Sequence, residues 1–165
     1  MRSTRWTKVI FIAYIILLTW VILFKMDLTE TIYRMQYSGY RSLNLIPFAG
    51  TAVYNGQLDY REIGLNIGVF IPYGIYLRVL HTKESRFHDF LQIALCSLLF
   101  EVIQFCFSIG VADVTDLLAN SLGGLVGIVL FDYLKKIGKT KVVGWINLWS
   151  LVGILFLLLY LQIRR

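Results

Sequence analysis

The sequence has little charge. Only 16% of its 165 residues are Asp, Glu, Lys or Arg, whereas 58% are hydrophobic, and the mean hydropathy is +0.69. A soluble domain of this length carries about 25% charged residues. The composition therefore excludes a soluble globular domain. It predicts a single integral membrane domain over residues 1–165.

Cysteine, histidine and known catalytic motifs are equally scarce. Cys96 and Cys106 lie on one predicted helix, about 15 Å apart along its axis, which is too far for a disulfide. His81 and His88 fall in a short predicted loop, and we interpret them as solvated residues. No nucleophile elbow, HExxH helix or phosphate-binding loop is present. The few acids make a thin ligand set for Mg²⁺ or Ca²⁺, so we predict no metal and no cofactor.

Long apolar stretches are what the sequence does contain. They predict transmembrane helices over residues 9–24, 63–80, 90–110, 113–133 and 142–163, since about 20 apolar residues span a bilayer. The predicted fold class is therefore an all-α integral membrane protein with about five transmembrane helices. Between helices one and two, Lys25 to Glu62 form a long segment in which tyrosines recur, as is typical of a membrane interface.

The basic residues predict an orientation. Of the 16 Lys and Arg residues, ten fall on the flanks that share a side with the N-terminus, and six fall on the opposite side. The positive-inside rule therefore places the N-terminus in the cytoplasm and the C-terminus outside, with the long segment on the outer face. The net charge of +6 reflects this cytoplasmic excess. It therefore needs no nucleic-acid partner, and the partner that we expect for the spans is the lipid bilayer.

Polar residues within two of the predicted helices form stripes. Glu101 is the only charged residue of the third helix, and a carboxylate inside a membrane is costly enough to suggest a function. Helical spacing aligns each stripe on one face: Ser97, Glu101, Gln104 and Ser108 on the third helix, and Asp113, Asp116 and Asn120 on the fourth. A short linker makes the two helices an antiparallel hairpin, so the stripes should face each other. Gly123 and Gly127 predict that this hairpin is tight at its cytoplasmic end and open outward.

Four runs stand in a fixed order along the chain: RSLNLIPF (Arg41–Phe48), NIGVFIPYG (Asn66–Gly74), FEVIQF (Phe100–Phe105) and GVADVTDLLANSLGG (Gly110–Gly124). In this order and spacing they resemble the VanZ family of glycopeptide-resistance membrane proteins, and the resemblance covers most of the chain. It implies a bacterial cell membrane protein that lowers susceptibility to teicoplanin and related lipidated glycopeptides. Many relatives carry an additional Asp where this chain has Thr115.

We predict that eight residues line an outward-facing intramembrane pocket, which acts on or shields a cell-envelope target. They are Arg41, Asn44, Asn66, Glu101, Gln104, Asp113, Asp116 and Asn120. Arg41 and Asn44 should close the pocket, with Arg41 pairing with a carboxylate or an anionic ligand group. The expected partners are a lipidated glycopeptide or a lipid-linked cell-wall precursor.

Other functions remain open for the same residues. A membrane enzyme modifying a cell-wall precursor or lipid would use Glu101 as general base, oriented by Asp113 or Asp116. A small ion-coupled transporter would use Glu101 as its proton or ion site. Structural roles compete as well, because Asn120 suits an interhelical hydrogen bond and Asp113 suits a helix N-cap.

Overall fold

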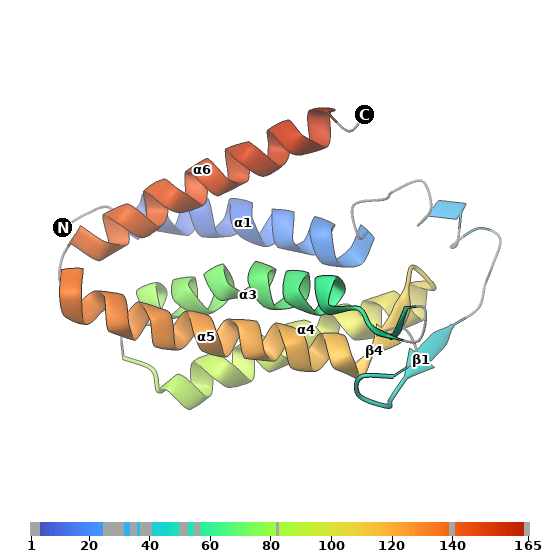
Figure 1. Cartoon of the computed structure of the whole chain (residues 1–165). Coiled ribbons are helices and arrows are strands. Elements are labelled where there is room, and N and C mark those ends of the chain that lie inside the picture. Colours follow the sequence, from blue (N-terminus) through green and yellow to red (C-terminus); the bar gives the residue numbers. More distant parts are fainter. Residues whose placement is uncertain are drawn as a thin grey trace.

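The protein is a bundle of membrane-length helices. The computed structural model describes residues 4–24, 32–33, 36, 41–49, 53–54, 57–81, 83–138 and 141–163. Its long helices are α1 (Thr4–Phe24), α3 (Tyr60–Leu80), α4 (Arg86–Phe107), α5 (Val114–Gly138) and α6 (Val142–Ile163) (Figure 1). The first four are long and apolar enough to cross a membrane, and α6 adds a shorter apolar stretch, Val142–Phe156. The predicted all-α membrane fold is confirmed.

The bundle has two distinct ends. The N-terminus, the α3–α4 turn and the α5–α6 turn lie at one end, which we call the N-terminal end (Figure 1). Short strands lie at the opposite end, which we call the strand end. There β1 (Ser42–Asn44) pairs in parallel with β4 (Val111–Asp113), and β2 (Val53–Tyr54) pairs with β3 (Gln57–Leu58) in antiparallel fashion. Within the predicted interfacial segment, residues 25–31, 34–35, 37–40, 50–52 and 55–56 lie outside the described residues.

Polar side chains fix where the helices begin. The Asp59 carboxylate accepts hydrogen bonds from the backbone N–H groups of Arg61 and Glu62, at 3.0 and 3.1 Å, and so caps α3. The Ser85 hydroxyl oxygen caps α4 by accepting from the His88 N–H at 3.1 Å. Such caps satisfy N–H groups that lack a partner within the helix.

Glycines bring α3 and α5 into backbone contact. A Cβ atom added at Gly123 would lie 2.1 Å from the carbonyl oxygen of Ile67, and one at Gly127 would lie 2.1 Å from that of Ile71. On α3, a Cβ at Gly74 would lie 2.0 Å from the carbonyl oxygen of Gly124. The glycines of α5 do allow a close helix approach, as predicted, but the prediction that they pack against α4 is wrong. The two glycines of the GxxxG pair face α3 rather than α4, because glycine on both α3 and α5 removes the side chains that would separate them.

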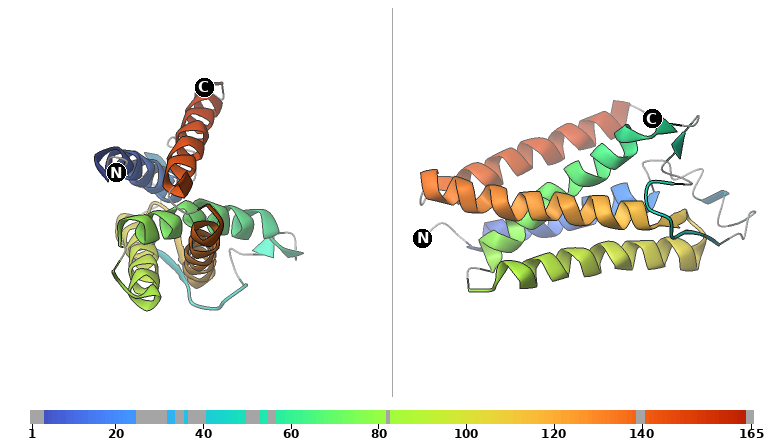
Figure 2. Two further views of the ribbon diagram at one scale, coloured as in Figure 1. Left: turned by 90° about the vertical axis from the view of Figure 1, so that its left-hand side faces the viewer. Right: turned by 60° about the horizontal axis from the view of Figure 1, so that its bottom comes forward.

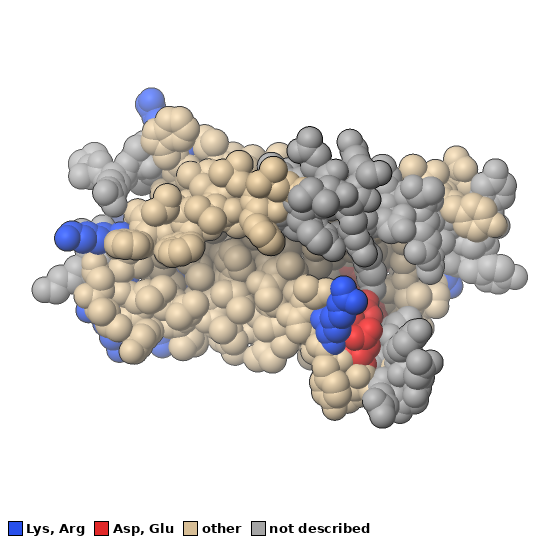
Figure 3. Space-filling model, turned by 45° about the horizontal axis from the view of Figure 1, so that its top comes forward, with Lys and Arg blue, Asp and Glu red and all other residues tan. Residues whose placement is uncertain are grey.

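Aromatic and branched side chains fill the centre of the bundle. Phe70, Tyr76, Ile93 and Ile128 are fully buried, and Phe70 meets Phe100 edge to face with ring centroids 6.4 Å apart. Many large apolar residues elsewhere on the helices are exposed, as expected where a helix faces lipid. On the face shown in Figure 3, uncharged side chains cover the broad middle, Lys and Arg residues lie at one end, and basic and acidic side chains lie next to each other toward the other end.

Helix α6 leans away from the other helices toward its C-terminal end (Figures 1 and 2). Polar contacts hold its first half. The Asn147 amide donates to the Thr7 hydroxyl of α1 at 3.0 Å and accepts from the Tyr76 hydroxyl of α3 at 3.4 Å. Because these bonds lie near the N-terminal end, they leave space between α6 and the bundle farther along the helix.

Candidate functional site

A polar cluster joins three separate parts of the chain at the strand end. The parallel pairing places Asn44 directly beside Asp113. The Asn44 amide donates to the Asp113 carboxylate at 2.9 Å and to the Ala49 carbonyl at 2.6 Å. The Glu101 carboxylate of α4 accepts the Asp113 backbone N–H at 2.7 Å. We call Asn44, Glu101, Asp113 and Thr115 the polar cluster.

Thr115 connects the cluster to the loop after β1. Its backbone N–H donates to the Asp113 carboxylate at 2.7 Å, so Asp113 caps the start of α5. Its hydroxyl oxygen accepts the Phe48 N–H at 3.0 Å. Phe48 adopts a positive φ of 57° at this point. Thr115 therefore anchors the RSLNLIPF segment to the start of α5.

This anchor gives a local prediction. In Thr115→Val the acceptor for the Phe48 N–H is lost while the side-chain shape is retained, so the loop should open more often. Loss of one such hydrogen bond corresponds to about 1 kcal/mol, or roughly fivefold faster exchange of the Phe48 amide. Hydrogen exchange of the purified protein measures this, with Thr19→Val as a control whose hydroxyl is bonded within α1. Unchanged exchange at Phe48 would contradict the anchor.

A second pair of polar residues lies on α3 and α5. The Asn66 amide donates to the Asp116 carboxylate at 2.6 Å. Asp116 thus faces α3, whereas Asn120 donates to the Ser97 hydroxyl of α4 at 3.0 Å. The predicted common stripe of Asp113, Asp116 and Asn120 facing α4 is therefore wrong for Asp116, because α5 packs between both neighbours.

Gln104 and Ser108 also depart from the predicted stripe. The Gln104 amide donates to the Ile22 carbonyl of α1 at 3.1 Å, so this side chain faces α1 rather than α5. Ser108 lies beyond α4 and ends it in a left-handed conformation with φ of 55°. Within the described part of the chain, the buried amide oxygens of Gln104 and Asn120 have no hydrogen-bond partner.

Arg41 lies at the edge of this region without joining it. Its guanidinium carbon is 5.9 Å from the centre of the Phe105 ring, and it makes no ion pair with any described carboxylate. The expected pairing with a carboxylate of the protein is not seen among these residues. A cation over an aromatic face is instead held by the ring's quadrupole.

An apolar rim, formed by residues of β1 and the loop after it, adjoins the polar cluster. Leu43, Leu45, Ile46 and Phe48 expose 51–69% of their surface on the loop that Asn44 and Thr115 hold in place. Within the cluster, Glu101, Asp113 and Thr115 are buried, with Glu101 exposed by 6% and Asp113 by 3%, and Asn44 is partly buried. The hydrogen-bonded polar cluster thus adjoins the exposed apolar rim. Whether the eight predicted residues line an open pocket stays a prediction.

The N-terminal end holds a charged cluster that the sequence reading missed. Arg78 donates to the Asp89 carboxylate at 2.8 Å, and its Nε lies 3.5 Å from Asp132, which also pairs with Arg86 at 2.7 Å. Asp89 is fully buried. His81 lies 3.0 Å from Asp89, so its interpretation as a solvated loop residue is wrong. The signal was an Asp just inside the start of α4, eleven residues after an Arg in the last turn of α3.

One group of described side chains has the composition of a metal site. His81, His88 and Asp89 place potential ligand atoms within 4.8 Å of one another. The second oxygen of Asp89 is already engaged by Arg78, whose charge opposes a neighbouring cation. The ion pairs and hydrogen bonds of Asp89 therefore explain the placement of these side chains without a metal ion.

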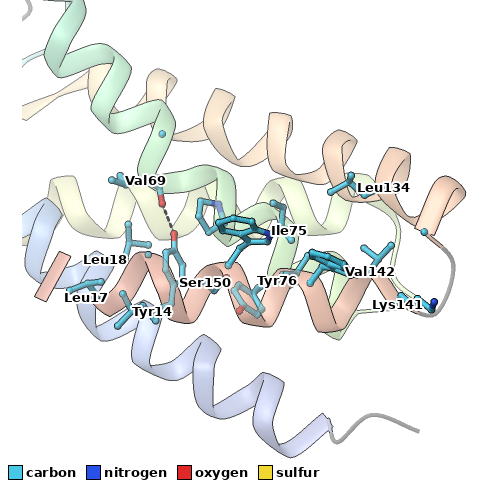
Figure 4. Close-up of a pocket in the computed structure, with 18 of the residues that line it drawn as sticks. Tyr14, Leu17, Leu18, Val69, Ile75, Tyr76, Leu134, Lys141, Val142 and Ser150 are labelled. Carbon is cyan, nitrogen blue, oxygen red and sulfur yellow. Dashed lines mark hydrogen bonds between the residues drawn. The ribbon is translucent and has the colours of Figure 1, made fainter. Parts of the chain in front are cut away.

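A large apolar cavity lies away from both polar regions. It has a volume of about 850 Å³ and is lined by α1, α3, the end of α5 and α6 (Figure 4). On its wall the Tyr14 hydroxyl donates to the Val69 carbonyl. Lys141 lines it at the N-terminal end, next to the turn between α5 and α6 (Figure 4). None of the eight predicted pocket residues lines this cavity.

Membrane-length helices with a buried acid–amide cluster at one end define a small polytopic membrane protein. The chain matches the VanZ/LLP1 family over residues 11–135, and so it belongs to this family. It is similar to Protein VanZ from Enterococcus faecium, with 35% identity over 151 residues that cover 92% of this chain and 88% of that protein. No solved structure matches the chain.

Proposed function

We propose that this protein lowers the susceptibility of its host to teicoplanin and related lipoglycopeptides by acting at the strand end of the bundle. Membership of the VanZ/LLP1 family supports the resistance role. The positive-inside distribution of Lys and Arg supports an outward-facing strand end and a cytoplasmic N-terminus. The partner is a lipidated glycopeptide or a lipid-linked cell-wall precursor.

The polar cluster is the observation that carries this proposal. A carboxylate buried at membrane depth is retained only where it has a specific task or partner. Here the Glu101 carboxylate fixes the Asp113 backbone, and Asp113 in turn fixes Asn44 and the start of α5. The acids thus hold an exposed apolar loop in one shape. A preorganised loop loses little conformational entropy when it binds a partner.

The apolar rim suggests how the loop meets its target. Leu45, Ile46 and Phe48 are exposed and adjacent, so they suit insertion among lipid tails at the interface. Lipoglycopeptides and lipid-linked precursors both place an acyl or isoprenoid chain in that layer. The rim then contacts the chain, while Asp116 and Asn66 offer polar groups to the head of the ligand. The protein acts as a shield or binder in this scheme.

The test measures teicoplanin protection conferred by variants in a susceptible host at matched membrane abundance. Glu101→Ala should remove most of the protection, because Asp113 and the β1 loop lose their fixed geometry. Asp116→Asn should weaken it independently of the loop. Glu84→Gln is the matched control, since this carboxylate is exposed by about half at the N-terminal end. Full protection by Glu101→Ala would exclude an essential role for Glu101.

The isosteric Glu101→Gln distinguishes binding from chemistry. A shield needs the shape and hydrogen bonding of the cluster, so Gln should preserve much of the protection. An enzyme that uses the carboxylate as a base should lose protection while still binding the drug or precursor. Comparing precursor composition in cells with and without the protein supplies the second readout. If wild-type protein gives no protection at all, the resistance role itself is wrong.

A further inference from the structure

The large apolar cavity runs along most of a membrane leaflet. Its α6 wall extends from Lys141 to Ile154, which is about 20 Å of helix at 1.5 Å per residue. Half of a bilayer's hydrocarbon core is about 15 Å thick. The cavity is therefore long enough to receive a lipid chain that enters from the interface at the N-terminal end.

Its wall offers almost nothing polar to a ligand. Leucine, isoleucine, valine and aromatic side chains make up most of the lining, and the Tyr14 hydroxyl is already bonded to the Val69 carbonyl. Gly68 of α3 and Gly153 of α6 lie exposed on opposite walls, where a side chain would meet no atom within 4 Å. The missing side chains leave the cavity accessible from the membrane. Because the lining is apolar, it makes favourable dispersion contacts with an alkyl chain of a membrane lipid.

The N-terminal end of the cavity is basic and aromatic. Lys141 is exposed there, and Trp145 follows one turn along the α6 wall with 59% exposure. Tryptophan favours the headgroup level of a bilayer, and lysine attracts anionic headgroups there. Charge complementarity therefore selects an anionic lipid over a zwitterionic one.

We infer that this cavity is a binding site for an anionic phospholipid. One acyl chain lies between α6 and the α1–α3 surface, and the phosphate lies beside Lys141. The bound chain fills the space that α6 leaves open and fastens this helix to the bundle. The inference does not depend on the proposed resistance function, because it involves none of the residues at the strand end.

The open glycines allow a direct test. Gly68 and Gly153 both line the cavity, and a Cβ added at either would meet no atom within 4 Å, so Gly68→Leu and Gly153→Leu should add bulk at the cavity and retain the fold. Gly64→Leu is the matched control, since Gly64 is equally open on α3 but lies outside the cavity. Native mass spectrometry of the purified protein with added phosphatidylglycerol measures occupancy. We expect each cavity variant to weaken binding by about tenfold or more, with Gly64→Leu unchanged.

Lys141→Gln tests the headgroup contact. This variant should lose most of the preference for phosphatidylglycerol over phosphatidylcholine, whereas Lys136→Gln, which lies outside the cavity, should retain it. Inorganic phosphate should not compete, because it lacks the chain that fills the cavity. Equal lipid binding by Gly64→Leu, Gly68→Leu and Gly153→Leu would overturn the inference. So would equal occupancy by the two lipids in the wild-type protein.

Discussion

Gly127→Leu is expected to prevent accumulation of the folded protein. A Cβ at this position would lie 2.1 Å from the Ile71 carbonyl oxygen and 3.0 Å from the Ile75 nitrogen. These are backbone atoms of α3, so no side chain can rotate away to make room. Helices α3 and α5 would have to separate along their whole contact, which also includes Gly123 and Gly74. Forcing extra atoms into a packed interface costs about 1–3 kcal/mol, and more when the backbone must move.

The yield of detergent-extracted monomer and its thermal unfolding midpoint measure this effect. Gly64→Leu is a suitable control, because the same substitution at an open position on α3 adds no collision. Gly127→Ala should fall between Gly127→Leu and wild type, since even a single methyl group meets the Ile71 carbonyl. Wild-type stability of Gly127→Leu would show that α3 and α5 do not touch as described.

The sequence alone predicts the helices well. Apolar length gives the spans, and the α6 range agrees with the prediction over Val142–Ile163. The sequence also predicts that Glu101, Asp113 and Asn44 lie at the same end of the bundle, because the direction of each helix and the family resemblance determine which helix ends lie together. The parallel pairing of β1 and β4 could not be predicted. Three-residue strands have no periodic signal, and their pairing depends on tertiary placement.

The partners of individual side chains are the part that the sequence could not supply. A stripe on a helix identifies a face but not the neighbour against which that face packs. Asp116 turns to Asn66 of α3, and Gln104 turns to the end of α1, because α4 and α5 each contact more than one helix. The glycines on α5 were assigned to α4 for the same reason.

The charged cluster at the N-terminal end was missed for a different reason. Charged residues near the ends of transmembrane helices are ordinarily solvated, so the sequence predicts no buried cluster that contains Asp89 and Asp132. In the structure Asp89 is fully buried, and Arg78 bridges it to Asp132. Only the three-dimensional arrangement of α3, α4 and α5 brings these charges together. This cluster ties the three helices at one end, as the polar cluster does at the other.

Asp89→Ala is therefore expected to be strongly destabilising. It leaves Arg78 with its side chain only 16% exposed and without its 2.8 Å partner, and it also removes the acceptor of His81. Breaking a buried ion pair by removing one partner costs about 3–5 kcal/mol, because the remaining charge is desolvated. Asp132, at 3.5 Å from the Arg78 Nε, remains and offsets part of this loss. Unfolding of the detergent-solubilised protein by SDS measures this loss. Glu84→Ala is the matched control, since that carboxylate is about half exposed.

The double variant Arg78→Met/Asp89→Leu separates charge burial from packing. Replacing both charges by apolar groups of similar size leaves no uncompensated ion, so this variant should be more stable than Asp89→Ala alone. The residual loss should come from Asp132, which keeps Arg86 but no longer has Arg78 nearby. If the effects of Arg78→Met and Asp89→Leu, each measured alone, simply add in the double variant, Arg78 and Asp89 do not interact in the folded protein. A positive coupling would instead identify this ion pair as the fastening between the end of α3 and the start of α4.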